Sequence, residues 1–173
     1  MSEWVLIAVV VAVALLAIAA LAKQQRGSPN AALYQPTKAL FSAAERSFLG
    51  VLDQAVGNEY RVFGKVRVAD VAAVKPGLTN AARQSALNRI LSKHFDFVVC
   101  RADDLAVVCA VELNDKSHSR KRARERDAFI AELCRTIDLP LVSVSAKQSY
   151  SLQDVRDQFR SAIALPPEER VVA

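Results

Sequence analysis

Two kinds of hydrophobic pattern divide the chain. Residues 4–22 are 19 positions without a charged or polar side chain. As a helix this run spans about 28 Å, close to the thickness of a bilayer core. Lys23 and Arg26 follow it, and positive charges next to a membrane segment remain in the cytoplasm. The pattern predicts a single-pass transmembrane anchor over residues 1–22 with a cytoplasmic C-terminal part, and a cleaved signal peptide is the alternative.

After a proline- and glycine-containing linker over residues 23–36, short apolar runs alternate with amphipathic ones as far as residue 165. Thr37 is the expected cap of the first helix, and residues 166–173 form a tail that begins with two prolines. The expected order is a helix over 38–56, a strand over 60–68, a helix over 80–93, strands over 95–100 and 105–113, a helix over 119–137, a strand over 140–145 and a helix from 151. This order predicts an α/β domain with a mixed central sheet flanked by helices.

The strand over 60–68 alternates between apolar and basic positions. Tyr60, Val62, Val66 and Val68 are expected to face inward, and Lys65 is expected to face outward with its basic neighbours.

The two central strands form a hairpin that contains one acid in each strand, Asp96 and Glu112. A hairpin centred on Asp104 pairs residues whose numbers sum to 208, so these two acids lie opposite each other. Like charges in that position destabilise a sheet, and a divalent cation between them is the simplest explanation. Without a metal, one of the two should have a raised pKa. A register slip of one residue would instead place the acids on opposite faces.

Positive charge gathers downstream of the hairpin. The chain has 23 Lys and Arg against 18 Asp and Glu, a net charge of +5. Arg120, Lys121, Arg122 and Arg124 stand at the start of the expected helix, where cations oppose the helix dipole unless an anion is bound. This cluster predicts a nucleic-acid-binding surface, with anionic lipid headgroups or a merely solvated face as alternatives.

The three cysteines have no metal-binding spacing, and an odd number excludes a full set of disulfides. We expect buried, reduced thiols.

These motifs resemble the PD-(D/E)xK nuclease superfamily, the restriction-endonuclease-like fold, over residues 37–145. More narrowly, the chain is similar to the bacterial domain-of-unknown-function family 2726, whose members often follow one membrane anchor and which resembles very-short-patch repair endonucleases. The matching residues are Asp96 in FDFVV, Glu112 in VELND, His118 six positions later, and Arg126-Asp127 in the next helix.

The resemblance implies a nuclease-like domain over residues 37–165, tethered to the bacterial inner membrane and hydrolysing nucleic-acid phosphodiesters with Mg²⁺. Asp96, Glu112 and the backbone carbonyl of Leu113 would be the metal ligands. Glu45, on the first helix, would correspond to an accessory acid.

One departure from the superfamily bears on activity. The lysine two residues after the glutamate is Asn114 in this chain, and an amide cannot supply the missing cation. Lys116 or His118 is then the expected substitute, although His118 has an equally simple interpretation as a structural histidine. If neither replaces the lysine, the domain is a catalytically inactive module that binds nucleic acid or protein.

Overall fold

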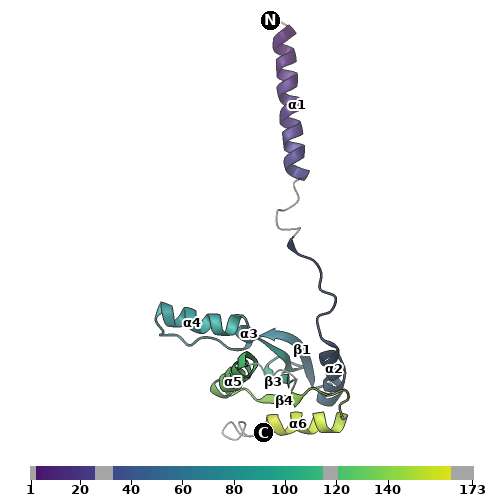
Figure 1. The fold of residues 1–173 in the computed structure, drawn as a ribbon, viewed down its shortest axis with the longest axis vertical. Coiled ribbons are helices and arrows are strands. Elements are labelled where there is room, and N and C mark those ends of the chain that lie inside the picture. The colour runs from purple at the N-terminus through teal and green to yellow at the C-terminus, as the bar shows by residue number, and fades with distance from the viewer. Residues whose placement is uncertain (1–2, 26–32, 115–120, 165–173) are drawn as a thin grey trace. The chain divides into compact units, whose positions relative to one another are not determined.

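A computed structural model of the chain describes residues 3–25, 33–114 and 121–164 (Figure 1). The chain divides into two compact units, residues 1–40 and residues 41–173. The first unit contains one long helix, α1 (Glu3–Gln25), and the second contains a four-stranded sheet with its helices.

Helix α1 corrects one expectation from the sequence. Among the residues that the structure describes, no helix combines the length and the apolar character needed to cross a membrane. The prediction of a transmembrane helix over residues 1–22 was therefore wrong.

The second unit contains the expected elements in the expected order, with one short helix added after the first strand. They are α2 (Ala43–Val56), β1 (Tyr60–Arg67), α3 (Val68–Val71), α4 (Asn80–Leu91), β2 (His94–Arg101), β3 (Val107–Asn114), α5 (Lys121–Thr136), β4 (Leu141–Ser145) and α6 (Leu152–Ala164). The sheet has the order β1-β2-β3-β4, in which β4 is parallel to β3 and the other pairs are antiparallel. The predicted mixed sheet flanked by helices is confirmed.

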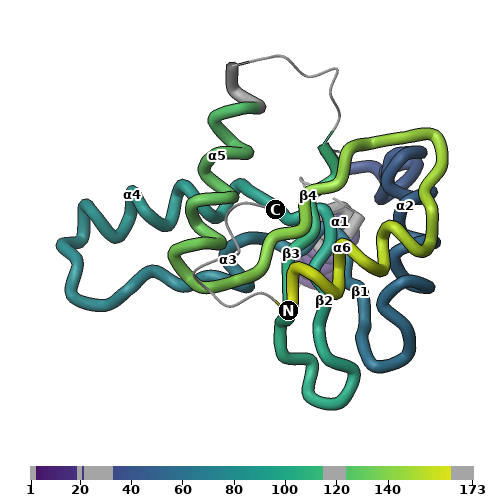
Figure 2. The backbone as a smooth tube through the Cα atoms, turned by 90° about the horizontal axis from the view of Figure 1, so that it is seen from below, coloured from purple at the N-terminus to yellow at the C-terminus, as the bar shows by residue number. Residues whose placement is uncertain are grey.

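Each face of the sheet has its own hydrophobic core, because the central strands are apolar on both sides. Helices α2 and α6 cover one face, where Phe48 and Phe159 pack against Phe97 and Val111. Helices α3 and α5 and the end of α4 cover the other face, and this second core includes Ile130. Figure 2 shows the strands side by side between these two groups of helices.

Helix α2 begins later than predicted, at Ala43 instead of Lys38. The Ser42 side chain accepts a hydrogen bond from the Glu45 N–H, and the Glu45 carboxylate accepts one of 2.8 Å from the Ser42 N–H. This capping box, not Thr37, defines the first turn. It also fixes the position of Glu45 beside the sheet.

Strand β1 changes face near its end. Tyr60 and Val62 contact the core under α2 and α6, whereas Val66 contacts the core under α5, so the four inward positions expected from the sequence do not share one face. Lys65 lies at the change with a φ of 57°, a left-handed conformation that is uncommon for residues other than glycine. The pairing of β1 with β2 is interrupted at Lys65 and Asp96, which would be partners if the ladder were continuous.

The three cysteines are free and buried, as predicted. Burial raises the pKa of the Cys109 and Cys134 thiols to about 12, so both are protonated and unreactive at neutral pH.

Candidate functional site

The hairpin register brings the two strand acids together. In β2 and β3 the residue numbers of paired positions sum to 208 next to the acids, as in Phe97 with Val111. Continued by one position, this register places Asp96 opposite Glu112, and it excludes the alternative of a one-residue register slip. Both side chains line one pocket of about 340 Å³. The predicted facing arrangement is therefore present.

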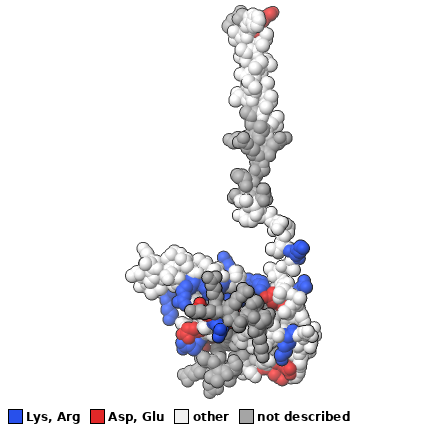
Figure 3. Space-filling model, in the orientation of Figure 1, with Lys and Arg blue, Asp and Glu red and all other residues white. Residues whose placement is uncertain are grey.

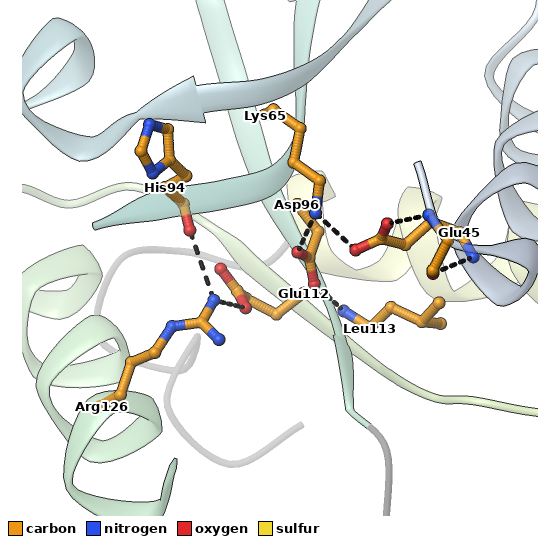
Figure 4. A network of polar contacts seen from close by, with 8 residues as sticks. Glu45, Lys65, His94, Asp96, Glu112, Leu113 and Arg126 are labelled. Atoms are coloured by element: carbon orange, nitrogen blue, oxygen red, sulfur yellow. Dashed lines mark hydrogen bonds and ion pairs between the residues drawn. The ribbon is translucent and has the colours of Figure 1, made fainter. Parts of the chain in front are cut away.

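Asp96 is held from both neighbouring strands (Figure 4). Its Oδ2 atom accepts a hydrogen bond of 3.0 Å from the backbone N–H of Leu113 on β3. Its Oδ1 atom lies 3.4 Å from the Nζ atom of Lys65 on β1. These two contacts fix the carboxyl group where the β1–β2 ladder is interrupted.

Lys65 connects Asp96 to helix α2 through a second ion pair, 2.5 Å long, with Glu45. Burial favours the neutral form of Glu45, but hydrogen bonds from Lys65 and Ser42 outweigh it and hold the Glu45 pKa below its ordinary value. Burial also disfavours the charged form of Lys65, but Glu45 and the charge of Asp96 outweigh it and raise the Lys65 pKa. Lys65 and Glu45 are therefore both charged at neutral pH.

Glu112 is the most buried acid of the site, with a side chain that is 8 % exposed. Arg126 on α5 donates a hydrogen bond of 3.0 Å to its Oε2 atom and one of 3.3 Å to the carbonyl oxygen of His94. The Oε1 atom is buried without a hydrogen-bond partner among the described residues. Burial, and then the charge of Asp96, raise the Glu112 pKa to about 7 although Arg126 opposes the shift. This agrees with the expectation that one acid of the pair has a raised pKa.

Three more residues from the sequence analysis lie in or beside this pocket. Glu45, Leu113 and Asn114 all line it, and the carbonyl oxygen of Asn114 accepts a hydrogen bond from Ala146. Leu113 contacts Asp96 through its backbone N–H, whereas its carbonyl group was the expected metal ligand.

The remaining predicted site residues are not brought to the pocket by the described part of the chain. Lys116, His118 and Arg120 lie outside the described residues, as do the side chains of Lys121 and Arg122 at the start of α5. Arg124 is exposed on α5.

Two cationic residues of the site were given no site role from the sequence. Lys65 was expected to face outward, but the kink at its own backbone turns it toward Asp96. Gly64 before it was the available signal, because a glycine inside a strand often marks a bulge or a bend. Arg126 belonged to a family motif but was given no role. Its spacing was the available signal, because it lies four and eight residues before the buried Ile130 and Cys134 and so on the helix face toward the sheet.

The donor atoms present suit a hard cation. Among the described residues, no group of three or more His, Cys, Asp and Glu side chains has an arrangement that holds a metal. Mg²⁺, however, is usually bound by one or two carboxylates, several waters and the phosphate of a substrate. Asp96 and Glu112 provide two such carboxylates, and the unpartnered Oε1 atom of Glu112 is a free oxygen donor. The residues therefore fit Mg²⁺ in its substrate-assisted mode of binding.

Fold and site together define a mixed α/β domain with two facing carboxylates and a lysine at one end of its sheet. The chain belongs to the family described as Protein of unknown function (DUF2726), whose model matches residues 37–163. This confirms the narrower of the two resemblances noted from the sequence. No curated protein and no solved structure matches the chain.

Proposed function

We propose that this protein is a divalent-metal-dependent nuclease that hydrolyses phosphodiester bonds of nucleic acid in the Asp96–Glu112 pocket. The observation that supports it best is the combination of two facing carboxylates with a cation, because Lys65 lies 3.4 Å from Asp96. Metal-dependent phosphodiester hydrolysis needs oxygen ligands for the metal and positive charge at the phosphate.

The proposal gives each side chain of the pocket a separate role. Asp96 and Glu112 hold Mg²⁺, which lowers the pKa of a bound water and stabilises charge on the phosphate. Lys65 provides the cation that the superfamily has at the position of Asn114, and it stabilises negative charge in the transition state. Glu45 holds Lys65 in place, and Arg126 orients Glu112.

The alternative is a catalytically inactive module that binds nucleic acid or protein on the same fold. Two observations favour it. Asn114 lines the pocket where a lysine would be expected, and Arg126 already neutralises part of the charge of Glu112 through the 3.0 Å ion pair.

The test is cleavage of labelled single-stranded and duplex DNA and RNA by the full-length chain, with Mg²⁺, with Mn²⁺ and without metal. We expect cleavage that requires metal and falls by roughly 100-fold or more in both Glu112→Gln and Lys65→Met. The first substitution removes a charged metal ligand, and the second removes a cation that stabilises negative charge in the transition state. Titration calorimetry should show that Asp96→Asn abolishes binding of Mn²⁺.

Arg61→Met is the matched control for Lys65→Met, because Arg61 is an exposed cation on the same strand. It should leave the rate of cleavage nearly unchanged. If the wild-type chain binds nucleic acid but cuts none with any divalent metal, while Asn114→Lys confers cutting, the inactive module is the correct interpretation.

A further inference from the structure

The segment between β1 and β2 has an unusual charge composition. From Val71 to Phe95 the chain contains four basic residues, Lys75, Arg83, Arg89 and Lys93, and no Asp or Glu. Since 23 basic residues exceed 18 acidic ones in the whole chain, these four leave an excess of only one elsewhere. Most of the net positive charge therefore belongs to this segment.

Helix α4, which forms most of this segment, is poorly buried. Ile90 is its one buried residue, and every position from Lys75 to Ser85 is exposed. Figures 1 and 2 both show α4 projecting away from the sheet, and the face of its projecting end that Figure 3 presents shows neither acidic nor basic side chains. A helix without a continuous apolar face gains little from burial, so its exposed surface is available for another role.

The base of α4 lies beside the acidic pocket. Arg89 and Lys93 stack over the ring of Phe129 on α5, at 4.5 and 4.7 Å from its centroid. The next residue, His94, begins β2, and its carbonyl oxygen accepts a hydrogen bond from Arg126, the partner of Glu112. The last basic residue of the segment, Lys93, thus lies three residues before Asp96.

We propose that α4 and the loop before it form a nucleic-acid-binding arm, in which Lys75, Arg83, Arg89 and Lys93 contact backbone phosphates. At 1.5 Å per residue the 12-residue helix is about 18 Å long, which corresponds to roughly five phosphates along one strand of a duplex. One point of this proposal rests on the proposed nuclease function, namely that the nucleic-acid strand leaving the arm enters the Asp96–Glu112 pocket.

Charge favours nucleic acid over an acidic protein as the occupant. The basic residues are spread along an arm that contains no acid, which suits the regular charges of a phosphate backbone. They also adjoin a pocket whose groups suit a phosphodiester.

The experiment measures binding of the full-length chain to a fluorescent duplex by anisotropy over a range of salt concentrations, without divalent metal so that no cleavage occurs. The variant Lys75→Gln/Arg83→Gln removes two exposed cations of the arm. The control Arg61→Gln/Arg160→Gln removes two exposed cations from β1 and α6 and changes the net charge equally.

We expect the arm variant to bind roughly tenfold more weakly and its slope of log affinity against log salt to be shallower by about 1.8, since each phosphate contact contributes about 0.9. The control should retain most of the affinity. Equal losses in both variants would mean that net charge alone acts, and would overturn the proposal.

Two further outcomes would also overturn the arm. One is the absence of binding to any nucleic acid, and the other is equally tight binding of a polyglutamate peptide, which would indicate an acidic protein partner. This assay contains no metal and therefore tests binding alone. If the chain binds through the arm here but cuts no nucleic acid in the cleavage experiment with any divalent metal, the nuclease proposal is refuted and the arm remains supported.

Discussion

At the scale of single residues, Glu112 couples the site to the stability of the fold. Its pKa is about 7 in the folded chain, against an ordinary value of 4.5. Between these values the folded state binds more protons than the unfolded state, so stability falls as the pH rises through this range. The cost of ionising Glu112 in the folded chain is on the order of 3 kcal/mol.

We predict that Glu112→Gln raises the free energy of unfolding by roughly 1–3 kcal/mol above about pH 8 and has little effect near about pH 4.5, because the amide resembles the protonated acid. Urea unfolding of the full-length chain at the two pH values measures the difference.

Glu132→Gln is the matched control on α5, because Glu132 is exposed and its ion pair with Arg135 lowers its pKa. It should not stabilise the chain at either pH. If Glu112→Gln destabilises the chain at both pH values, the hydrogen bond to Arg126 outweighs the cost of the buried charge.

At the scale of elements, two adjacent residues of β1 shape the site. A Cβ atom on Gly64 would lie 2.2 Å from the ring of Phe41, which stacks on Phe97 with 5.7 Å between ring centroids. Lys65 beside it has the left-handed backbone conformation that turns its side chain toward Asp96. Strain of this kind occurs where a functional side chain must be placed against the local preference of the backbone.

Gly64→Ala should therefore lower the free energy of unfolding by about 1–3 kcal/mol, because the Phe41 ring must move from its place against Phe97. Gly50→Ala is the matched control, since Gly50 lies inside α2 with nothing within 4 Å of its added Cβ. Alanine favours a helix over glycine, so this control should stabilise the chain by about 0.5–1 kcal/mol. Equal effects of the two substitutions in urea unfolding would contradict the close contact at Gly64.

At the scale of the whole molecule, the site exists only after the sheet has assembled. Its charged groups come from α2, β1, β2, β3 and α5, and they meet in one network at one end of the sheet. A ligand that binds this network stabilises the folded chain as a whole, because the unfolded chain has no such arrangement.

Mg²⁺ or Mn²⁺ should accordingly raise the free energy of unfolding, by about 2.7 kcal/mol at a concentration 100 times the dissociation constant. Asp96→Asn should abolish the increase, whereas Asp53→Asn, which changes an exposed acid on α2, should preserve it. Thermal unfolding with and without metal measures both variants. A metal effect of the same size in the two variants would place the cation elsewhere.

The sequence alone determined the features that depend on neighbouring residues. The apolar runs and their breaks predicted the order of the elements. The register predicted from a turn at Asp104 holds from Val99 toward the acids, but a register shift between Val99 and Cys100 pairs Cys100 with Val107 nearer the turn. Local periodicity is sufficient to find the two strands and the faces of their acids, because each depends on neighbouring residues, whereas the shift near the turn was not visible in the sequence.

Only the tertiary structure decided which cations join those acids. Alternation placed Lys65 outside, but in the structure Lys65 has a left-handed backbone conformation, and the Gly64 backbone before it lies against the ring of Phe41, 23 positions earlier in the chain. The pairing of Arg126 with Glu112 requires α5 to cross the sheet at one particular place. Contacts of this kind depend on how elements pack in three dimensions, which neither local propensity nor periodicity encodes.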